Sequence, residues 1–232
     1  MNSFFHLLRW DLTMQFRYGF WIAGIFATLP WAVILYYVPQ STAQKFLPAC
    51  IFLDISVMGI LFMAAIYFFE KREGSLLAVA ITPIKTWQWL TSKLLTLGIL
   101  GSTFCILLVA MRMGTKAAWG YILISAVCMN VLFILIGFLL ASPFDKFNTF
   151  FVSFALGFGL MEIPALIFLD IYHPLYWIFP TQPTVAMLQG SFGDMTLGHF
   201  LRLLGIQLAW IAFGFWLSIK FYRRYVSQRM GG

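Results

Sequence analysis

The stretch 70-EKREGSLLAVAITPIKTWQWLTSK-93 is the longest polar interruption of the chain, and long hydrophobic runs flank it on both sides. Only 10% of the 232 residues are charged and 62% are hydrophobic, whereas a typical soluble domain has about 25% charged residues. The mean hydropathy is +0.89. The composition therefore predicts an all-α integral membrane protein in which residues 70–93 form a loop between two membrane spans.

Six predominantly apolar runs are long enough to cross the ~30 Å hydrocarbon core of a bilayer as helices. Two acids, Asp54 and Glu162, lie inside them, and a carboxylate at the bilayer centre costs about 2.5–3.5 kcal/mol on insertion scales. Both are candidates for a substrate path, and the alternative for Asp54 is a paired or protonated packing residue near the outer surface. The six runs cover residues 20–38, 46–69, 94–110, 119–141, 149–169 and 198–221.

Residues 1–17 are too polar to span a membrane but have the spacing of an amphipathic helix. We expect this helix to lie in the membrane interface, with protein on one side and lipid on the other. A cleaved signal peptide is the alternative, but the following apolar run is too long and has no A-x-A-like site. Two apolar stripes run along the helix: Phe5, Leu8, Leu12 and Phe16 form one, and Leu7, Trp10 and Met14 form the other.

Residues 162–197 are rich in proline, aromatic and turn-forming residues and contain no Lys or Arg. This region is too apolar for a solvated loop and too often interrupted for a membrane span. It is predicted to form short re-entrant helices that dip back into one leaflet.

The basic residues predict the orientation. With the N-terminus inside, 11 of the 15 Lys and Arg residues fall in inner segments and 3 in outer segments. Such an asymmetry follows the positive-inside rule. It predicts that both termini and the 70–93 loop are cytoplasmic and that the 162–197 region is extracytoplasmic.

The loop itself is predicted to contain two helical segments. Ser75 suits the N-cap of a short helix whose surface, residues 76–81, is apolar. Thr82 and Pro83 suit the N-cap and first residue of a second helix that runs into the third span. Residues 76–81 are too apolar for a solvated loop, so we expect lipid or a partner protein to cover them.

Several functions are excluded by missing motifs. The chain contains no G-x-x-x-x-G-K-[ST] sequence and therefore no P-loop for ATP. It has no Ser/His/Asp set, H-E-x-x-H motif, paired carboxylates or Cys/His metal spacing, which predicts no catalytic residue, metal or cofactor on this chain. The net charge is +7, but membrane topology explains the basic residues better than nucleic-acid binding.

The sequence resembles the ABC-2-type permeases of ATP-binding-cassette exporters. The topology matches over the whole chain, and the matching motifs are Glu73-Gly74-Ser75-Leu76, Thr82-Pro83 and Lys93. Within that family the chain is similar to the short bacterial permeases of drug or fluoroquinolone export.

The resemblance implies one transmembrane permease domain over residues 1–232, located in the bacterial cytoplasmic (inner) membrane. It implies a separate ABC ATPase subunit that binds ATP and Mg²⁺, and a second permease copy or a related permease. The substrate is expected to be amphipathic or lipophilic and to move outward through a gate formed by the 162–197 region. The residues implied in coupling to the ATPase are Glu73, Gly74, Ser75, Leu76, Leu77, Thr82 and Pro83.

Two other classes remain as alternatives. A secondary transporter would show internal repeats and several charges near the bilayer midplane, and no convincing repeat is present. A lipid-modifying membrane enzyme would need a polar constellation at the interface, which the sequence does not show. Neither alternative would have an ATPase partner.

Overall fold

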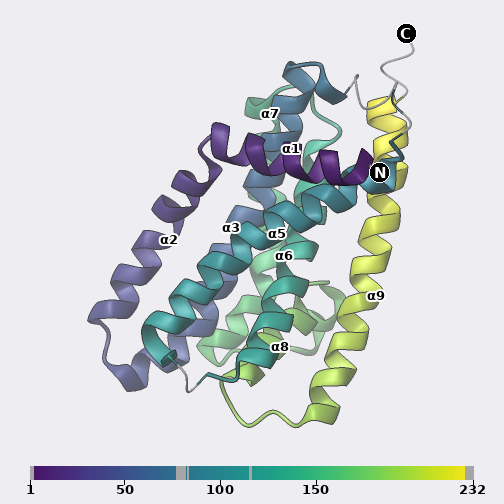
Figure 1. Cartoon of the computed structure of the whole chain (residues 1–232). Coiled ribbons are helices and arrows are strands. Elements are labelled where there is room, and N and C mark those ends of the chain that lie inside the picture. Colours follow the sequence, from purple (N-terminus) through teal and green to yellow (C-terminus); the bar gives the residue numbers. More distant parts are fainter. Residues whose placement is uncertain (1–2, 77–81, 83, 115–116, 228–232) are drawn as a thin grey trace.

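The computed structural model describes residues 3–76, 82, 84–114 and 117–227, and every regular element within these residues is helical (Figure 1). Six helices are long and apolar enough to cross a membrane, which confirms the number of spans expected from the sequence. In chain order the elements are α1 (Ser3–Arg17), α2 (Phe20–Tyr37), α3 (Gln40–Arg72), α5 (Thr86–Met113), α6 (Trp119–Ala141), α7 (Phe147–Glu162), η2 (Ile163–Leu169), η3 (Pro174–Ile178), α8 (Gln182–Ser191), α9 (Leu197–Phe221) and η4 (Tyr222–Ser227).

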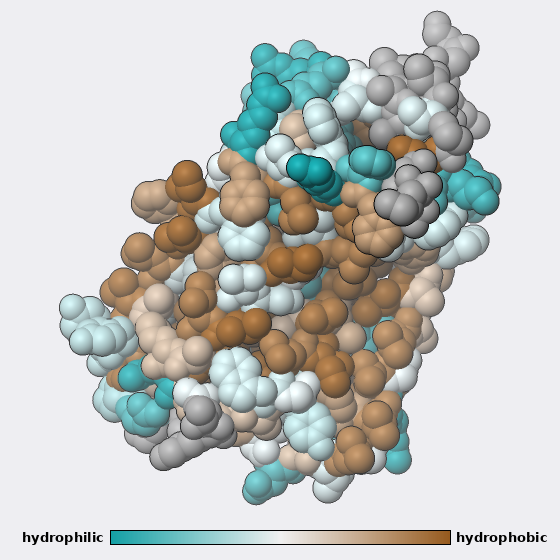
Figure 2. All heavy atoms as spheres, viewed as in Figure 1, coloured by the Kyte–Doolittle hydropathy of each residue, from teal (hydrophilic) through white to brown (hydrophobic). Residues whose placement is uncertain are grey.

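The bundle has two distinct ends, and α1 lies across one of them (Figure 1). The last turns of α3 and α9 and the first turn of α5 reach the same end, which we call the α1 end. The opposite end, where α8 lies, is called the α8 end. Figure 2 shows a broad apolar belt between the two, with hydrophilic residues gathered toward each end.

Helices α3 and α6 form the centre of the bundle. In each of them 67% of the most apolar stretch is buried, against 11% for the span that begins with α7 and 17% for that of α9. The two central helices pack closely because Gly137 of α6 lies against the backbone of Ile60 on α3. A Cβ atom at Gly137 would lie 2.7 Å from the Ile60 carbonyl oxygen. Small residues at such crossings let helix backbones approach.

One face of α1 is buried and the other is exposed, as expected for an amphipathic helix. Leu7 and Met14 are buried, and Asp11 lies between them on the same face. The predicted second stripe is wrong at Trp10, which is 51% exposed. The buried face runs from Met14 through Leu7 and Asp11 to Gln15, which spans about 100° of the helix, and Trp10 lies about 40° beyond Met14, outside this face.

The start of α5 also differs from the prediction. Helix α5 begins at Thr86, whereas the sequence favoured a start at Pro83. Lys85 has an extended backbone and is the N-cap, and its N–H donates to the Gln88 side chain at 2.8 Å. A glutamine at the third helical position therefore caps this helix in place of Thr82.

The region after α7 contains short helices, as predicted. The 3₁₀ helices η2 and η3 each have a proline in their first turn, and α8 follows with Pro183 near its start. Helix α8 is buried along most of its length, with Val185, Met187 and Leu188 fully enclosed. It packs on α6 and α9, so this region belongs to the bundle rather than to a free loop.

The close approach of α3 and α6 gives a test of the packing. We expect Gly137→Ala to lower stability by about 1–3 kcal/mol, because the added methyl group meets backbone rather than a side chain that can move. The matched control is Gly120→Ala on the same helix, where nothing lies within 4 Å of the added Cβ. Thermal unfolding in detergent should show a lower midpoint for Gly137→Ala only. Equal midpoints for both variants would contradict this packing.

Candidate functional site

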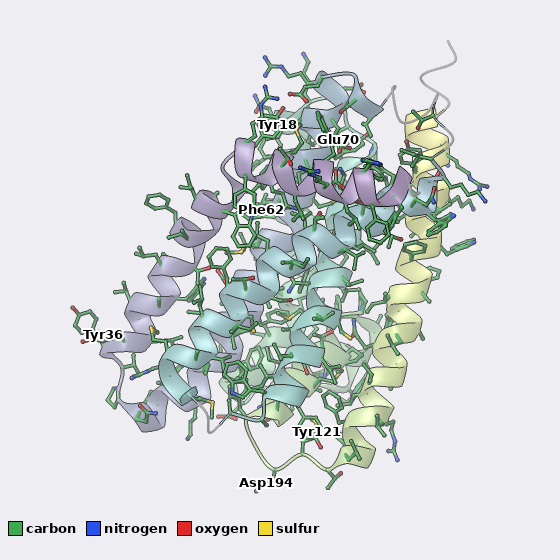
Figure 3. The ribbon with its side chains drawn as sticks, viewed as in Figure 1. Tyr18, Tyr36, Phe62, Glu70, Tyr121 and Asp194 are labelled. Carbon is green, nitrogen blue, oxygen red and sulfur yellow. The ribbon has the colours of Figure 1, made fainter. Side chains whose placement is uncertain are left out.

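A buried ionic cluster lies at the α1 end, where α1, α3 and α5 meet. The Lys93 ammonium forms ion pairs with the carboxylates of Asp11 and Glu70. The side chains of Lys93 and Asp11 are each 1% exposed, and that of Glu70 is 9% exposed. Figure 3 shows Glu70 beside α1 at this end of the bundle. One cation therefore joins three helices that are distant in the sequence.

Neutral donors complete the coordination of both carboxylates. The Ser92 hydroxyl donates to Asp11. The indole N–H of Trp89 donates to Glu70 at 3.0 Å. Ser92 and Trp89 both lie on α5, within one turn of Lys93. A single turn of α5 thus supplies the cation and two further hydrogen-bond donors.

The indole of Trp89 also links the cluster to the last span. The Lys93 Nζ atom lies 5.7 Å from the centroid of the Trp89 ring. On its other side, the ring of Tyr222, which directly follows α9, lies 5.0 Å from that of Trp89. The end of α9 therefore packs against the same turn of α5 that carries the cluster.

The charges of the cluster are unequal, with two carboxylates facing one ammonium. Removing water from such ions is costly, and their mutual attraction offsets that cost only with good geometry and further hydrogen bonds. Loss of one partner leaves a buried charge unpaired, which costs about 3–5 kcal/mol. Lys93 is the partner of both acids, so its loss would be the most severe.

The Glu73-Gly74-Ser75-Leu76 motif ends α3 and turns the chain. The Tyr18 hydroxyl donates to the Glu73 carboxylate, which attaches the turn to the residue after α1. Gly74 has a φ of 74°, in the left-handed region that favours glycine. The Ser75 hydroxyl donates to a carbonyl in the last turn of α3 at 3.1 Å. Each described residue of the motif thus has a local structural role.

The remaining predicted coupling residues fall in three different settings. Leu76 is 3% exposed and belongs to the hydrophobic core of the chain itself, so neither lipid nor a partner is needed to cover it. Thr82 is exposed. Leu77 and Pro83, with most of the expected short helix, lie outside the described residues.

Asp11 was not among the residues expected to form a site. It is the only acid in residues 1–17, and it lies four residues after Leu7 and three before Met14. These spacings place all three on one face of a helix. A carboxylate on this apolar face was a signal that Asp11 has a buried partner. Lys93, which directly precedes the third apolar run, was the corresponding signal for a cation.

The two predicted path residues, Asp54 and Glu162, do not form one site. Asp54 lies between α2 and α3, where the Thr28 hydroxyl donates to its carboxylate at 2.9 Å. Glu162 is the last residue of α7, and Ser56 of α3 is its polar neighbour. Residues 54 and 56 are about 200° apart around a helix, so the two acids approach opposite sides of α3.

The carboxylate of Glu162 lacks the partners that the other buried acids have. Both of its oxygens are buried, and neither has a hydrogen-bond partner within the described part of the chain. The residue stands where α7 gives way to the 3₁₀ helix η2. Nearby, the Thr181 hydroxyl donates to the Met161 carbonyl at 2.8 Å, which ties this break to the start of α8.

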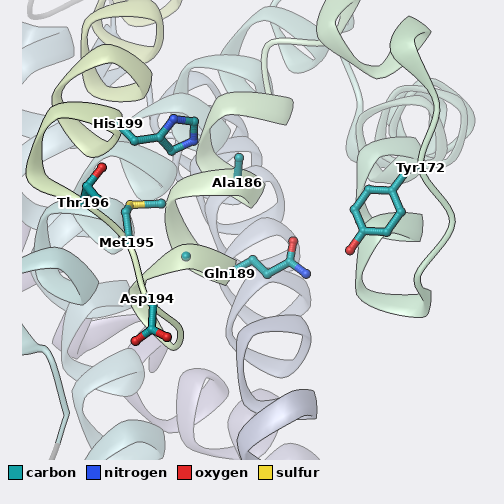
Figure 4. Close-up of a pocket in the computed structure, with 8 residues that line it drawn as sticks. Tyr172, Ala186, Gln189, Asp194, Met195, Thr196 and His199 are labelled. Carbon is teal, nitrogen blue, oxygen red and sulfur yellow. The ribbon is translucent and has the colours of Figure 1, made fainter.

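A polar pocket of about 410 Å³ lies at the α8 end, between the segment after η2 and the turn from α8 to α9. In Figure 4, Tyr172 lies on one side of the pocket, and Asp194 and His199 lie on the other. Gln189 contributes an amide between them. The pocket is distant from the ionic cluster, because the two lie at opposite ends of the bundle.

The six spans define a multi-pass membrane protein, and comparison with known proteins defines its family. The profile of the fluoroquinolones export permease protein family matches residues 2–230. Fluoroquinolones export permease proteins from two strains of Mycobacterium tuberculosis are each 26% identical over 228 residues, which cover 97% of this chain and 96% of theirs. The chain belongs to this export permease family, which confirms the resemblance to ABC-2-type permeases.

The ionic cluster predicts a large difference between two lysines. We expect Lys93→Met to destabilise the chain by about 3–5 kcal/mol, because Asp11 and Glu70 lose their cation. Lys71→Met should cost at most about 1 kcal/mol, because the ion pair of Lys71 with Asp145 is solvent-exposed. Thermal unfolding of both variants in detergent measures the difference.

A triple variant separates charge from packing. Asp11→Asn, Glu70→Gln and Lys93→Met together remove all three charges of the cluster and should recover much of the stability lost by Lys93→Met alone. A triple variant that is no more stable than the single variant would show that lost packing, rather than unpaired charge, causes the effect.

Proposed function

We propose that the chain is the transmembrane permease subunit of an ATP-binding-cassette exporter, in which a separate chain binds ATP and Mg²⁺. The observation that carries the proposal is the Asp11–Glu70–Lys93 cluster, which fixes both ends of the 70–93 loop to α1 in a member of an export permease family. The loop is the proposed docking site of the ATPase. The proposed coupling residues are Glu73, Gly74, Ser75, Leu76, Leu77, Thr82 and Pro83.

The contacts of the loop support a role in transmitting force. Its first part is bound to the α1–α2 turn through Glu73 and Tyr18, and its two ends are bound to each other and to α1 through Lys93. A displacement of the loop by the ATPase would therefore move α1, α3 and α5 together. Helices α3 and α5 would carry the movement across the membrane, because each is unbroken over its whole length.

The proposed orientation places the α1 end in the cytoplasm of a bacterium, with the protein in its cytoplasmic membrane. The 11 basic residues assigned to inner segments favour this orientation. Helix α1 then lies in the interface, where its exposed aromatic side chains Phe5 and Phe16 contact lipid. Helices η2, η3 and α8 form the re-entrant region and outer gate.

The proposed substrate is an amphipathic or lipophilic molecule that moves outward. The relatives from M. tuberculosis are named for the export of fluoroquinolones, which supports this chemical class. Asp54 and Glu162 remain the proposed residues of the path. A second permease, either another copy or a related chain, is the proposed partner in the membrane, and the exposed spans of α7 and α9 offer it a surface.

Docking of the ATPase can be tested by purifying the tagged chain from its native host in nanodiscs. We expect a P-loop ATPase to co-purify in stoichiometric amount. Leu77→Asp should weaken its binding at least about tenfold, because a charge replaces an apolar contact in the proposed interface. Lys146→Asp is the matched control, since Lys146 is exposed at the α1 end but belongs to the α6–α7 connection.

Two outcomes would contradict the proposal in different ways. A pure chain without any ATPase would favour the secondary transporter or the membrane enzyme. An ATPase that binds the Leu77→Asp variant as strongly as the native chain would place docking outside the 70–93 loop. Leu76→Asp is a test of folding rather than of docking, because Leu76 is buried. If Leu77→Asp unfolds as Leu76→Asp does, its loss of the ATPase reports lost folding and not lost docking.

A further inference from the structure

A groove of about 350 Å³ runs between α2 and α5, within the apolar belt of the bundle. Its walls include Ala32 of α2 and Phe104, Leu107 and Met111 of α5. Thr28 is the one polar side chain among the described residues that line it. Leu107 and Met111 are 55% and 43% exposed, so the groove opens toward the outside of the bundle, where lipid would lie.

Contacts of α5 with α2 and with the start of α3 close both ends of the groove. At one end Gly24 lies so close to the Phe104 ring that a Cβ atom there would be 2.3 Å from a ring carbon. At the other end the Arg112 guanidinium donates to the Val38 carbonyl, and the Gln40 amide donates to the Arg112 carbonyl at 2.9 Å. The two helices are thus held together at both ends of the groove, so the fold itself maintains the gap between them.

A buried carboxylate lies directly behind the polar wall residue. The Thr28 hydroxyl lies 2.9 Å and 3.2 Å from the two carboxylate oxygens of Asp54, which is only 2% exposed. Asp54 has no ion pair with any residue that the structure describes. Arg112, which follows the groove residue Met111 on α5, donates to a backbone carbonyl instead. An acid in this position is costly unless a positive charge approaches it.

We propose that the α2–α5 groove is a binding site for a lipophilic cation that enters from the bilayer. The apolar body of the ligand occupies the groove, and its charged group reaches Asp54 when the Thr28 side chain rotates aside. Charge complementarity selects this occupant: a lipid acyl chain or an apolar face of a second copy would use the apolar walls but bring no positive charge to Asp54. The inference deepens the proposed export function by naming a substrate class.

The test measures equilibrium binding of tetraphenylphosphonium, a lipophilic cation, to the purified full-length chain in nanodiscs. Asp54→Asn should weaken binding at least about tenfold, because a desolvated charge pair is lost. The same variant should bind uncharged triphenylmethane as the native chain does. Asparagine keeps the size of Asp54 and can still accept from Thr28, and thermal unfolding of the variant checks that the fold is kept.

A second pair of variants locates the site. Ala32→Phe fills the groove and should weaken binding of both probes, whereas Val33→Phe, on the exposed neighbouring face of α2, should weaken neither. Three results would overturn the proposal: unchanged tetraphenylphosphonium binding by Asp54→Asn, equal loss of both probes in that variant, or equal behaviour of Ala32→Phe and Val33→Phe.

The assay is independent of the ATPase, so the two proposals can fail separately. Binding that depends on Asp54, in a chain with which no ATPase co-purifies, would overturn the exporter assignment and support the site. Suppose instead that an ATPase docks on the 70–93 loop, but the native chain and Asp54→Asn bind tetraphenylphosphonium equally. That result would overturn the binding site and leave the exporter assignment standing.

Discussion

The two ion pairs of Lys93 are the interaction on which the α1 end depends. An ammonium group within an apolar bundle is stable only where acids or other polar groups surround it, and the two acids here come from α1 and α3. Because the attraction is strong in a desolvated site, none of the three helices can move away without leaving a charge unpaired. The position of α1, and with it the surface on either side of the 70–93 loop, follows from this constraint.

The buried acids of the chain are stabilised in different ways along the membrane normal. At the α1 end Asp11 and Glu70 share a cation, which makes that end rigid. Deeper in the bundle Asp54 has a hydroxyl as its partner, and Glu162 has no hydrogen-bond partner within the described residues. The acids that pair with a cation thus lie beside the loop, whereas the acids without an ion pair among the described residues lie within the spans. Under the proposed function, this distribution would separate a part of the molecule that transmits movement from a part that binds a ligand.

The spans could be predicted from the sequence because hydropathy and length are local properties, and the bilayer admits few other structures. The short helices of the 162–197 region were predictable for the same reason, from their proline residues. The ionic cluster was not, because Asp11 and Lys93 are 82 residues apart and neither has a neighbour in sequence that indicates the other. The start of α5 was misplaced since the Gln88 side chain, three residues inside the helix, supplies the cap. The buried position of Leu76 likewise depends on contacts that a linear pattern does not contain.

The separation between Asp11 and Lys93 also constrains how the protein is made. Helix α1 leaves the ribosome before α5, so Asp11 is synthesised before its partner Lys93, which follows 82 residues later. During that interval two complete spans, α2 and α3, are synthesised between α1 and its partner. Until α5 is synthesised, the buried carboxylate of α1 therefore lacks its cation, and the contacts between α1 and α5 cannot form. Assembly of the α1 end therefore has to wait for the third span, although α1 precedes all six spans in the chain.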